Sequence, residues 1–217
     1  MSIFKQLCRT LVLSAVVVAL SVGLMGCPDT PPDDEVGGYD YSLSCGNHPC
    51  RTVVMPDGKT WMAENLNYEI EISWCYNDSP DSCAKYGRLY PWAEAKAVCP
   101  KGWHLPSRDE WGGLAKSAGG TGDYGANDTA GKKLKSTSGW NSDGNGTDDF
   151  GFSALPGGFG GGARGGFVNV GEFGSWWMDT EQNSGNAYHR HMSYRDESVY
   201  EGVWSKGDAL SVRCIKN

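Results

Sequence analysis

Apolar side chains repeat at helical spacing in residues 107–120, the most informative stretch of the chain. Ser107 and Glu110 form a capping-box pattern, in which the serine accepts a hydrogen bond from the amide three residues on and the glutamate reaches back. Gly119 and Gly120 are of the residue type that ends a helix. The pattern predicts a helix with a buried face made of Trp111, Leu114, Ala115 and Ala118.

A second short helix is predicted directly before it, over residues 91–99. Pro91 stands at its start, where proline is tolerated, and Pro100 blocks its continuation after Cys99. The segment GWHLP, residues 102–106, then joins the two helices. We expect the rest of the domain to be assembled around this corner.

Strand patterns occur on both sides of the helical corner. A Pro-Asp-Gly turn at residues 56–58 separates two short apolar runs, which predicts a β-hairpin over residues 52–63. Residues 88–90 form a strand-like stub, and the alternation of Phe150, Phe152 and Ala154 predicts a core strand that ends at Pro156. Four later strands are expected at residues 173–178, 188–194, 198–204 and 209–215.

Glycine-rich segments separate these elements and favour one fold class. Residues 119–146 are expected to form a long surface loop with a short segment at 132–136, and residues 157–166 a flexible loop. Because 31 of the 217 residues are glycine, turns and loops are favoured over long helices. The expected architecture is α+β, with two short helices early and mostly antiparallel short strands late.

The first 26 residues have the pattern of an export signal. A basic head over residues 1–9 precedes an apolar run over residues 11–22, which is too short for a transmembrane helix because such a helix needs about 20 residues. The following Leu-Met-Gly-Cys resembles the bacterial lipobox, and this resemblance implies cleavage before Cys27 and attachment of lipid to its sulfur. The alternative is a soluble exported protein cut near Gly26.

A tether is expected after the lipid site. Residues 28–38 contain prolines, acidic residues and almost no apolar side chains, so they cannot bury enough surface to fold. We predict a signal peptide over residues 1–26, a lipidated cysteine and tether over residues 27–44, and one folded domain over residues 45–217. The expected location is the bacterial cell envelope, at the outer membrane or cell surface, with the lipid as the membrane anchor.

The charge of the mature chain excludes one class of partner. Of the 19 basic and 26 acidic residues, only Lys5 and Arg9 lie in the signal peptide, which leaves a net charge of −9. An acidic domain lacks the basic surface that binds phosphate backbones, so we expect no nucleic-acid partner. The same sign disfavours adsorption to an anionic bilayer surface.

The expected domain retains Cys45, Cys50, Cys75, Cys83, Cys99 and Cys214. An even number in an exported chain indicates disulfide bonds, although spacing alone does not establish their pairing. Proximity suggests two local loops, Cys45–Cys50 and Cys75–Cys83, which would leave Cys99 with Cys214. A zinc site is disfavoured because the sequence has no CxxC pair.

The histidines offer candidate chemistry, with a structural alternative for each. A catalytic role of His104 would need a nucleophile or carboxylate within reach, and the alternative is a structural residue that hydrogen bonds to a neighbouring carbonyl. His189 and His191 share one face of a predicted strand and could form a metal pair, but their spacing implies no third ligand. We favour solvent-facing polar side chains for this pair.

Oxygen-bearing side chains alternate in residues 143–149, as at the start of a calcium-binding loop. The segment lacks the later bidentate glutamate of an EF-hand, and the alternative is an ordinary turn cluster. Calcium is the cofactor that the sequence suggests. Its candidate ligands are Asp143, Asn145, Thr147 and Asp149.

Aromatic residues are the main candidate ligand contacts. Trp176 and Trp177 are neighbours on one strand and point to opposite faces, so one is expected in the core while the other could stack on a sugar or a partner. Core packing is the alternative for every aromatic named here. The glycine-rich loop could form a variable binding rim. The candidate ligand-binding residues are Trp140, Arg164, Trp177, Tyr200 and Trp204.

Five sequence blocks together resemble one bacterial family. The blocks are WMAENLNY at residues 61–68, YPWAEAKAVCPKGWHLPSRDEW at 90–111, GFSALPGGF at 151–159, GSWWMDT at 174–180 and SVRCIKN at 211–217. They occur in the order found in the Fibrobacter succinogenes major paralogous domain. The resemblance implies a secreted protein or lipoprotein and implies no activity.

A wider resemblance is to the C-type-lectin-like fold, including relatives of the formylglycine-generating enzymes. In that fold a helix ends in a cysteine, Gly-x-His-Leu-Pro follows, a second helix carries Ser-x-x-Glu, and a cysteine of the last strand pairs back to the first. Residues 99–110 and Cys214 fit this pattern, which implies a Cys99–Cys214 disulfide. No EPN or QPD triplet of a calcium-dependent sugar site occurs, and the redox cysteine pair of the formylglycine-generating enzymes is missing.

The combined expectation is a lipid-anchored, non-enzymatic module of the cell envelope that binds extracellular polysaccharide or protein. One alternative is a structural surface protein with no diffusible ligand. Another is an enzyme of the formylglycine-generating or a hydrolytic type, which is disfavoured because the sequence shows no pair of nucleophile and base.

Overall fold

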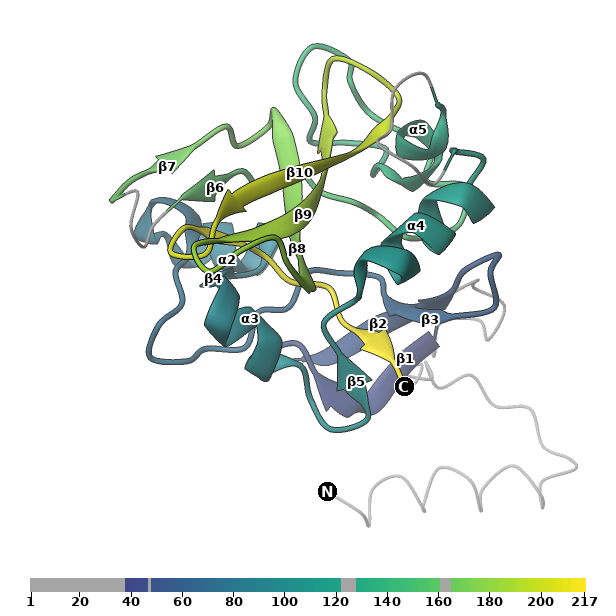
Figure 1. Cartoon of the computed structure of the whole chain (residues 1–217). Coiled ribbons are helices and arrows are strands. Elements are labelled where there is room, and N and C mark those ends of the chain that lie inside the picture. Colours follow the sequence, from purple (N-terminus) through teal and green to yellow (C-terminus); the bar gives the residue numbers. More distant parts are fainter. Residues whose placement is uncertain (1–37, 47, 122–127, 161–164) are drawn as a thin grey trace, which may run out of the picture. The chain divides into compact units, whose positions relative to one another are not determined.

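The computed structural model describes residues 38–46, 48–121, 128–160 and 165–217. Two five-stranded sheets form its frame (Figure 1). Their strand orders are β1-β2-β3-β12-β5 and β10-β9-β8-β11-β4. Every pairing within them is antiparallel except that of β8 with β11. The predicted α+β class with mostly antiparallel strands is therefore confirmed.

The elements have the following bounds. The first sheet contains β1 (Gly38–Ser44), β2 (Pro49–Val54), β3 (Thr60–Met62), β12 (Ile215–Lys216) and β5 (Trp103–His104). The second sheet contains β10 (Val199–Ser205), β9 (Asn186–Ser193), β8 (Phe173–Glu181), β11 (Ala209–Ser211) and β4 (Leu89–Pro91). A small sheet pairs β6 (Phe159–Gly160) with β7 (Phe167–Val168). The helices are η1 (Tyr76–Asp78), α2 (Pro80–Tyr86), α3 (Trp92–Val98), α4 (Arg108–Ser117) and α5 (Ala130–Leu134).

The helical corner forms as predicted. The Ser107 hydroxyl accepts a hydrogen bond from the Glu110 N–H at 3.2 Å, and the Glu110 carboxylate accepts one from the Ser107 N–H at 2.8 Å. The helix predicted over residues 91–99 is α3, which ends directly before Cys99 and Pro100. The predicted apolar face of α4 is buried in the core: Trp111, Leu114, Ala115 and Ala118.

Glu110 makes the acid stability of this corner testable. Burial alone would raise the pKa of its carboxyl, but hydrogen bonds from the Ser107 backbone N–H and from His104 outweigh burial and lower the pKa from 4.5 to about 2. The folded pKa is thus below the unfolded value, so the stabilisation is complete above about pH 4.5 and is lost as the pH falls toward about 2. We expect Glu110→Gln to flatten the fall in the free energy of unfolding across this range, measured by denaturant titration. Asp109→Asn removes the same charge from the same turn and should keep the native pH dependence; an equal effect of both variants would contradict this assignment.

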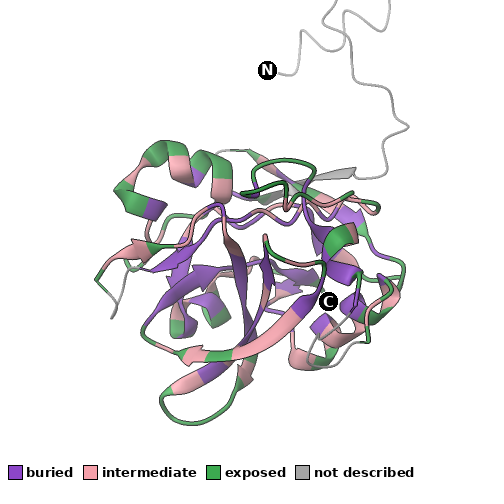
Figure 2. Ribbon diagram, turned by 90° about the horizontal axis from the view of Figure 1, so that it is seen from above, coloured by how far each residue is buried: buried purple, intermediate pink, exposed green. Residues whose placement is uncertain are grey.

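Two apolar clusters occupy the two faces of the second sheet. Trp176 lies in one cluster with Trp61 and Trp111, whose ring centroids are 5.0 Å apart. Trp177, the next residue on β8, lies in the other cluster with Tyr90. Figure 2 shows the central strands buried along most of their length, while exposed residues gather on helix surfaces and turns. Both faces of this sheet are therefore covered.

Three disulfides close the structure, and their pairing confirms the expectation. Cys45–Cys50 and Cys75–Cys83 close local loops. Cys99–Cys214 joins the end of α3 to the segment between β11 and β12, across a sequence separation of 115 residues. Within the described ranges, no helix is both long and apolar enough to cross a membrane.

Two boundaries differ from the expectation. Residues 38–44 were assigned to the tether, but they form β1, which pairs with β2, so the folded domain begins before Cys45. Residues 209–215 were expected to form one strand, but they divide between β11 and β12. The chain leaves the second sheet after Ser211 and enters the first at Ile215, so that β11 lies between β8 and β4 while β12 lies between β3 and β5.

The expected loops hold more structure than their glycine content suggested. Residues 119–146 contain α5 and the buried Trp140, whose indole N–H donates to the Ala154 carbonyl at 3.1 Å. Residues 150–156 are buried in part, yet they form a single bridge between Lys135 and Ala154 in place of the predicted strand. Residues 157–160 are buried and include β6, which corrects the expectation of a flexible loop there. Helix α2, which begins at Pro80 and ends before Gly87, was not predicted from the sequence.

Candidate functional site

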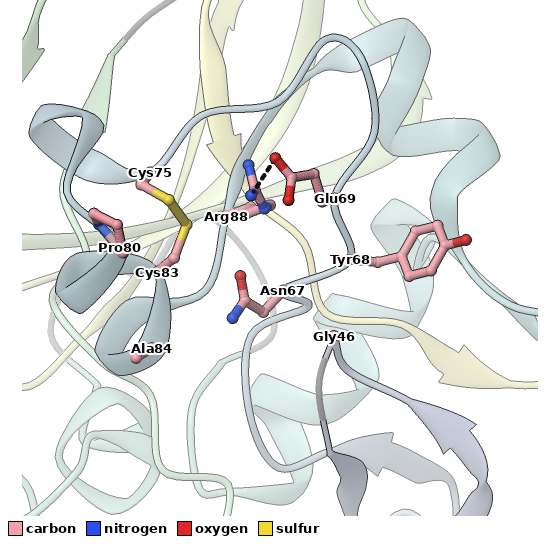
Figure 3. A pocket seen from close by; sticks show the side chains of 9 residues that line it. All are labelled: Gly46, Asn67, Tyr68, Glu69, Cys75, Pro80, Cys83, Ala84 and Arg88. Atoms are coloured by element: carbon pink, nitrogen blue, oxygen red, sulfur yellow. Dashed lines mark ion pairs between the residues drawn. A yellow bond between two sulfur atoms is a disulfide. The ribbon is translucent and has the colours of Figure 1, made fainter.

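A polar hollow of about 530 Å³ lies beside the segment that connects β3 to η1. Figure 3 shows the Cys75–Cys83 disulfide and the Glu69–Arg88 ion pair around this hollow, with Asn67 between them and the Tyr68 ring projecting from the rim. The Tyr68 side chain also lines a second hollow of about 330 Å³, shared with Leu66, Val98 and other residues. Tyr68 is 51% exposed, which is unusual for so large an aromatic ring.

Buried hydrogen bonds hold the backbone of this segment. The Asn65 side chain accepts from the Trp176 indole N–H at 2.8 Å and donates to the Tyr86 carbonyl at 2.8 Å. The hydroxyl of the buried Tyr90 donates to the Tyr68 carbonyl at 2.7 Å. Burial raises the pKa of Tyr90, so its hydroxyl keeps the proton that makes this bond. The exposed Tyr68 therefore stands on a fixed backbone.

Two glycines let other chain segments approach this backbone closely. A Cβ on Gly46 would lie 2.5 Å from the Asn67 carbonyl oxygen, and one on Gly87 would lie 2.7 Å from the Asn65 Cβ. Both glycines also have positive φ angles, of 116° and 75°. Only glycine meets both conditions without strain, so these positions fix the shape of the hollow.

The charged wall of the hollow is an ion pair. Arg88 Nη2 lies 2.8 Å from Glu69 Oε1, with side-chain exposures of 13% and 78%. Arg88 Nη1 also donates to the Ser73 hydroxyl at 3.4 Å, which ties the guanidinium to the loop. The hollow thus combines guanidinium and amide donors, carboxylate and amide acceptors, and an exposed aromatic face. Such a set suits a polyhydroxylated ligand, because hydroxyls pair with both kinds of group while a ring packs against C–H bonds.

This site was not predicted from the sequence. Its members are close in space because the β1–β2 connection, the segment after β3, α2 and the residue before β4 meet there, whereas Gly46, Tyr68 and Arg88 are far apart in the chain. The available signal was the end of WMAENLNY, where the polar Asn67 and the aromatic Tyr68 follow Leu66.

The candidate ligand-binding residues differ in how far their side chains are exposed. Trp140 and Trp177 are 4% and 0% exposed, so neither offers a face for stacking, which corrects the expectation for both. Tyr200 and Trp204 are half-buried on one face of the second sheet. Arg164 and the proposed lipid site Cys27 lie outside the described residues.

The histidines are held by the fold. His104 Nδ1 lies 2.6 Å from Asn217 Oδ1, and its Nε2 lies 3.1 Å from both Glu110 carboxylate oxygens. A carboxylate is therefore within reach, and it is the one that caps α4. His189 is 4% exposed, which corrects the expectation that the His189–His191 pair faces solvent.

The candidate calcium ligands are in a turn that uses some of their oxygens. Asn145 Oδ1 accepts from the Trp140 N–H at 3.0 Å, and the Thr147 hydroxyl donates to the Lys132 carbonyl at 3.4 Å. Asp143 and Asp149 are exposed. In the parts of the chain that the structure describes, no group of three or more histidine, cysteine, aspartate or glutamate residues is placed to hold a metal ion.

Comparison with known proteins identifies the family. No curated protein and no solved structure matches the chain at a significant level. A family model, the Fibrobacter succinogenes major domain, matches residues 54–216. Because this match covers well over half of the chain, including every strand of the second sheet, the chain belongs to the Fibrobacter succinogenes major domain family.

Proposed function

We propose that this protein is a lipid-anchored module of the bacterial cell envelope that binds extracellular polysaccharide without catalysis. The observation that carries the proposal is the rigid hollow beside Tyr68, in which an exposed ring stands next to paired donors and acceptors. Aromatic residues that are partly exposed on a fixed backbone are typical of recognition surfaces. The lipobox resemblance supports the anchor, and the acidic tether supports display of the domain away from the membrane.

Several features favour a sugar over a protein as the ligand. The wall of the hollow is mostly polar, with Asn67, Glu69 and Arg88 beside a single exposed ring. A protein interface usually presents a larger apolar centre with several anchors. A C-type-lectin-like identity of the fold would agree with this proposal, although the acidic calcium triplets of sugar-binding lectins are not in the sequence. The proposed binding mode is therefore independent of calcium.

We expect Tyr68→Ala to weaken polysaccharide binding about 5- to 30-fold, because the variant loses the stacking face, worth roughly 1–2 kcal/mol. Binding of the purified protein to a panel of plant and bacterial polysaccharides, by affinity electrophoresis and calorimetry, measures the effect. The free energy of unfolding should change little, since the ring is exposed.

Two controls sharpen this test. Tyr68→Phe keeps the ring and should keep most of the affinity, whereas Val54→Ala removes an exposed apolar side chain on β2 and should change nothing. Binding that survives Tyr68→Ala unchanged would place the ligand elsewhere on the domain. Absence of binding to every polysaccharide, with and without calcium, would favour a structural role at the cell surface.

A further inference from the structure

The second sheet places two histidines on one face, opposite unusually small neighbours. In the β8–β9–β10 ladder, His191 lies between Ser175 and Tyr200, and His189 lies between Trp177 and Gly202. Directly opposed residues of antiparallel strands share a face. Ser175 therefore leaves space beside the imidazoles that a larger side chain would fill, and the absent side chain of Gly202 makes room for the His189 ring itself.

That space is a cavity of about 140 Å³. It is lined by seven residues of β6, β8, β9, β10 and the β7–β8 connection: Phe159, Asn169, Phe173, Ser175, His189, His191 and Trp204. The His189 ring lies against the backbone of β10, where a Cβ on Gly202 would come within 2.4 Å of its Cε1 atom. A cavity of roughly 150 Å³ holds one benzene ring.

The two imidazoles also have unpaired ring nitrogens. The Nδ1 atoms of His189 and His191 are buried and have no hydrogen-bond partner among the described residues. The two rings are stacked with centroids 5.2 Å apart, and His191 is stacked in turn on Tyr200 at 5.3 Å. Leaving a buried polar atom unpaired costs about 1–3 kcal/mol, so a pair of such atoms at one cavity calls for an explanation.

The histidines are uncharged at neutral pH. Burial lowers the pKa of His189 to about 3, and the neighbouring His191 and Arg190 act in the same direction while the Gly202 backbone opposes them. Burial lowers the pKa of His191 to about 4, aided by Arg190 and opposed by Asp196. A neutral imidazole offers one donor and one acceptor. Among the described residues, no lysine, arginine, aspartate or glutamate lines the cavity, which favours an uncharged ligand.

We infer that this cavity binds a small uncharged aromatic molecule of one ring that carries a hydroxyl or N–H group. The ring would pack among Phe159, Phe173 and Trp204, and its polar group would exchange hydrogen bonds with the His189–His191 pair or the Ser175 hydroxyl. The site is separate from the Tyr68 hollow and does not depend on the proposed polysaccharide binding.

Phenol is the probe for this site, and toluene is its matched control without the hydroxyl. Titration of the purified full chain, followed by NMR of the histidine rings, should show saturable shifts of His189 and His191 with phenol at a dissociation constant of about 1 mM or lower. Toluene should bind several-fold more weakly. In the double variant His189→Phe, His191→Phe, which keeps two rings but no nitrogens, the preference for phenol should disappear.

A cavity-filling variant tests the location. Ser175→Val replaces the hydroxyl opposite His191 by a methyl group and adds a second one, and should weaken phenol binding about tenfold, while Tyr68→Ala and the exposed-site variant His48→Phe should leave it unchanged. Circular dichroism confirms that each variant is folded. The inference is overturned if phenol shifts neither histidine of the native protein, or if folded Ser175→Val binds as the native protein does. It is also overturned if zinc chloride, and not phenol, shifts the two rings, since the pair would then be a metal site.

Discussion

Replacement of Cys99 and Cys214 by alanine is expected to lower the free energy of unfolding by about 4–5 kcal/mol. The bond joins residues 115 positions apart, so its loss gives the unfolded chain much more conformational freedom. It also ties the end of α3 to the segment where the chain passes from one sheet to the other. A loss of this size approaches the whole stability of many small domains.

The matched control is the pair Cys45→Ala, Cys50→Ala. It removes one disulfide and the same atoms, but the loop spans a sequence separation of only 5, for which the chain-entropy model gives about 2 kcal/mol. Urea titration of both double variants under non-reducing conditions measures the difference. Equal losses in the two variants would show that loop length does not determine the contribution of these bonds.

Replacement of Arg213 by methionine is expected to cost about 3–5 kcal/mol of folding stability. The guanidinium is completely buried and donates to Asn65 Oδ1 at 2.9 Å and to the Ser153 carbonyl at 2.7 Å, with further bonds to the Phe152 and Met62 carbonyls. It also lies 4.2 Å from the centroid of the Phe152 ring. Methionine fills much of the same volume, but it removes the guanidinium donors of the Phe152 and Ser153 carbonyls and leaves Asn65 Oδ1 with only the Trp176 indole N–H.

Two variants separate the charge from the geometry of Arg213. Burial lowers the pKa of Arg213 to about 9, so the side chain is still charged at neutral pH. Arg213→Lys retains a cation but not the planar fork, and should lose an intermediate amount. Arg195→Met removes an exposed guanidinium from the turn after β9 and should change the thermal midpoint little. If Arg213→Met unfolded at the same thermal midpoint as the native protein, the stabilising role of the Arg213 hydrogen bonds would be refuted.

Local patterns predicted the parts of the fold that depend on nearby residues. The capping box of Ser107 and Glu110, the hairpin around Gly58 and the two short-range disulfides each follow from residues that are close in sequence. The strands β8, β9 and β10 of the second sheet were also predicted, because turn residues separate these runs in the sequence. Alternation does not reveal how many layers cover a sheet. For this reason it could not predict that Trp176 and Trp177 are both buried.

The features that could not be predicted from the sequence depend on contacts between residues that are far apart in the chain. Trp140 and α5 are in a glycine-rich stretch, and only packing against residues near Ala154 shows that this stretch is structured. The Tyr68 hollow requires Gly46 and Arg88 to meet, which no local pattern encodes. The burial of His189 depends on Gly202, whose missing side chain allows the ring to lie against β10.

The passage of residues 209–216 between the two sheets also sets the order of events in folding. Within the described chain, β5 has β12 as its strand partner and β4 has β11, so both strands pair with segments that follow them far along the sequence. Contacts between such distant segments make folding slow, because a long stretch of chain must be ordered before they form. A nascent chain that does not yet contain residues 209–216 therefore lacks the strands that would complete both sheets, so we expect it to stay unfolded until those residues have been made.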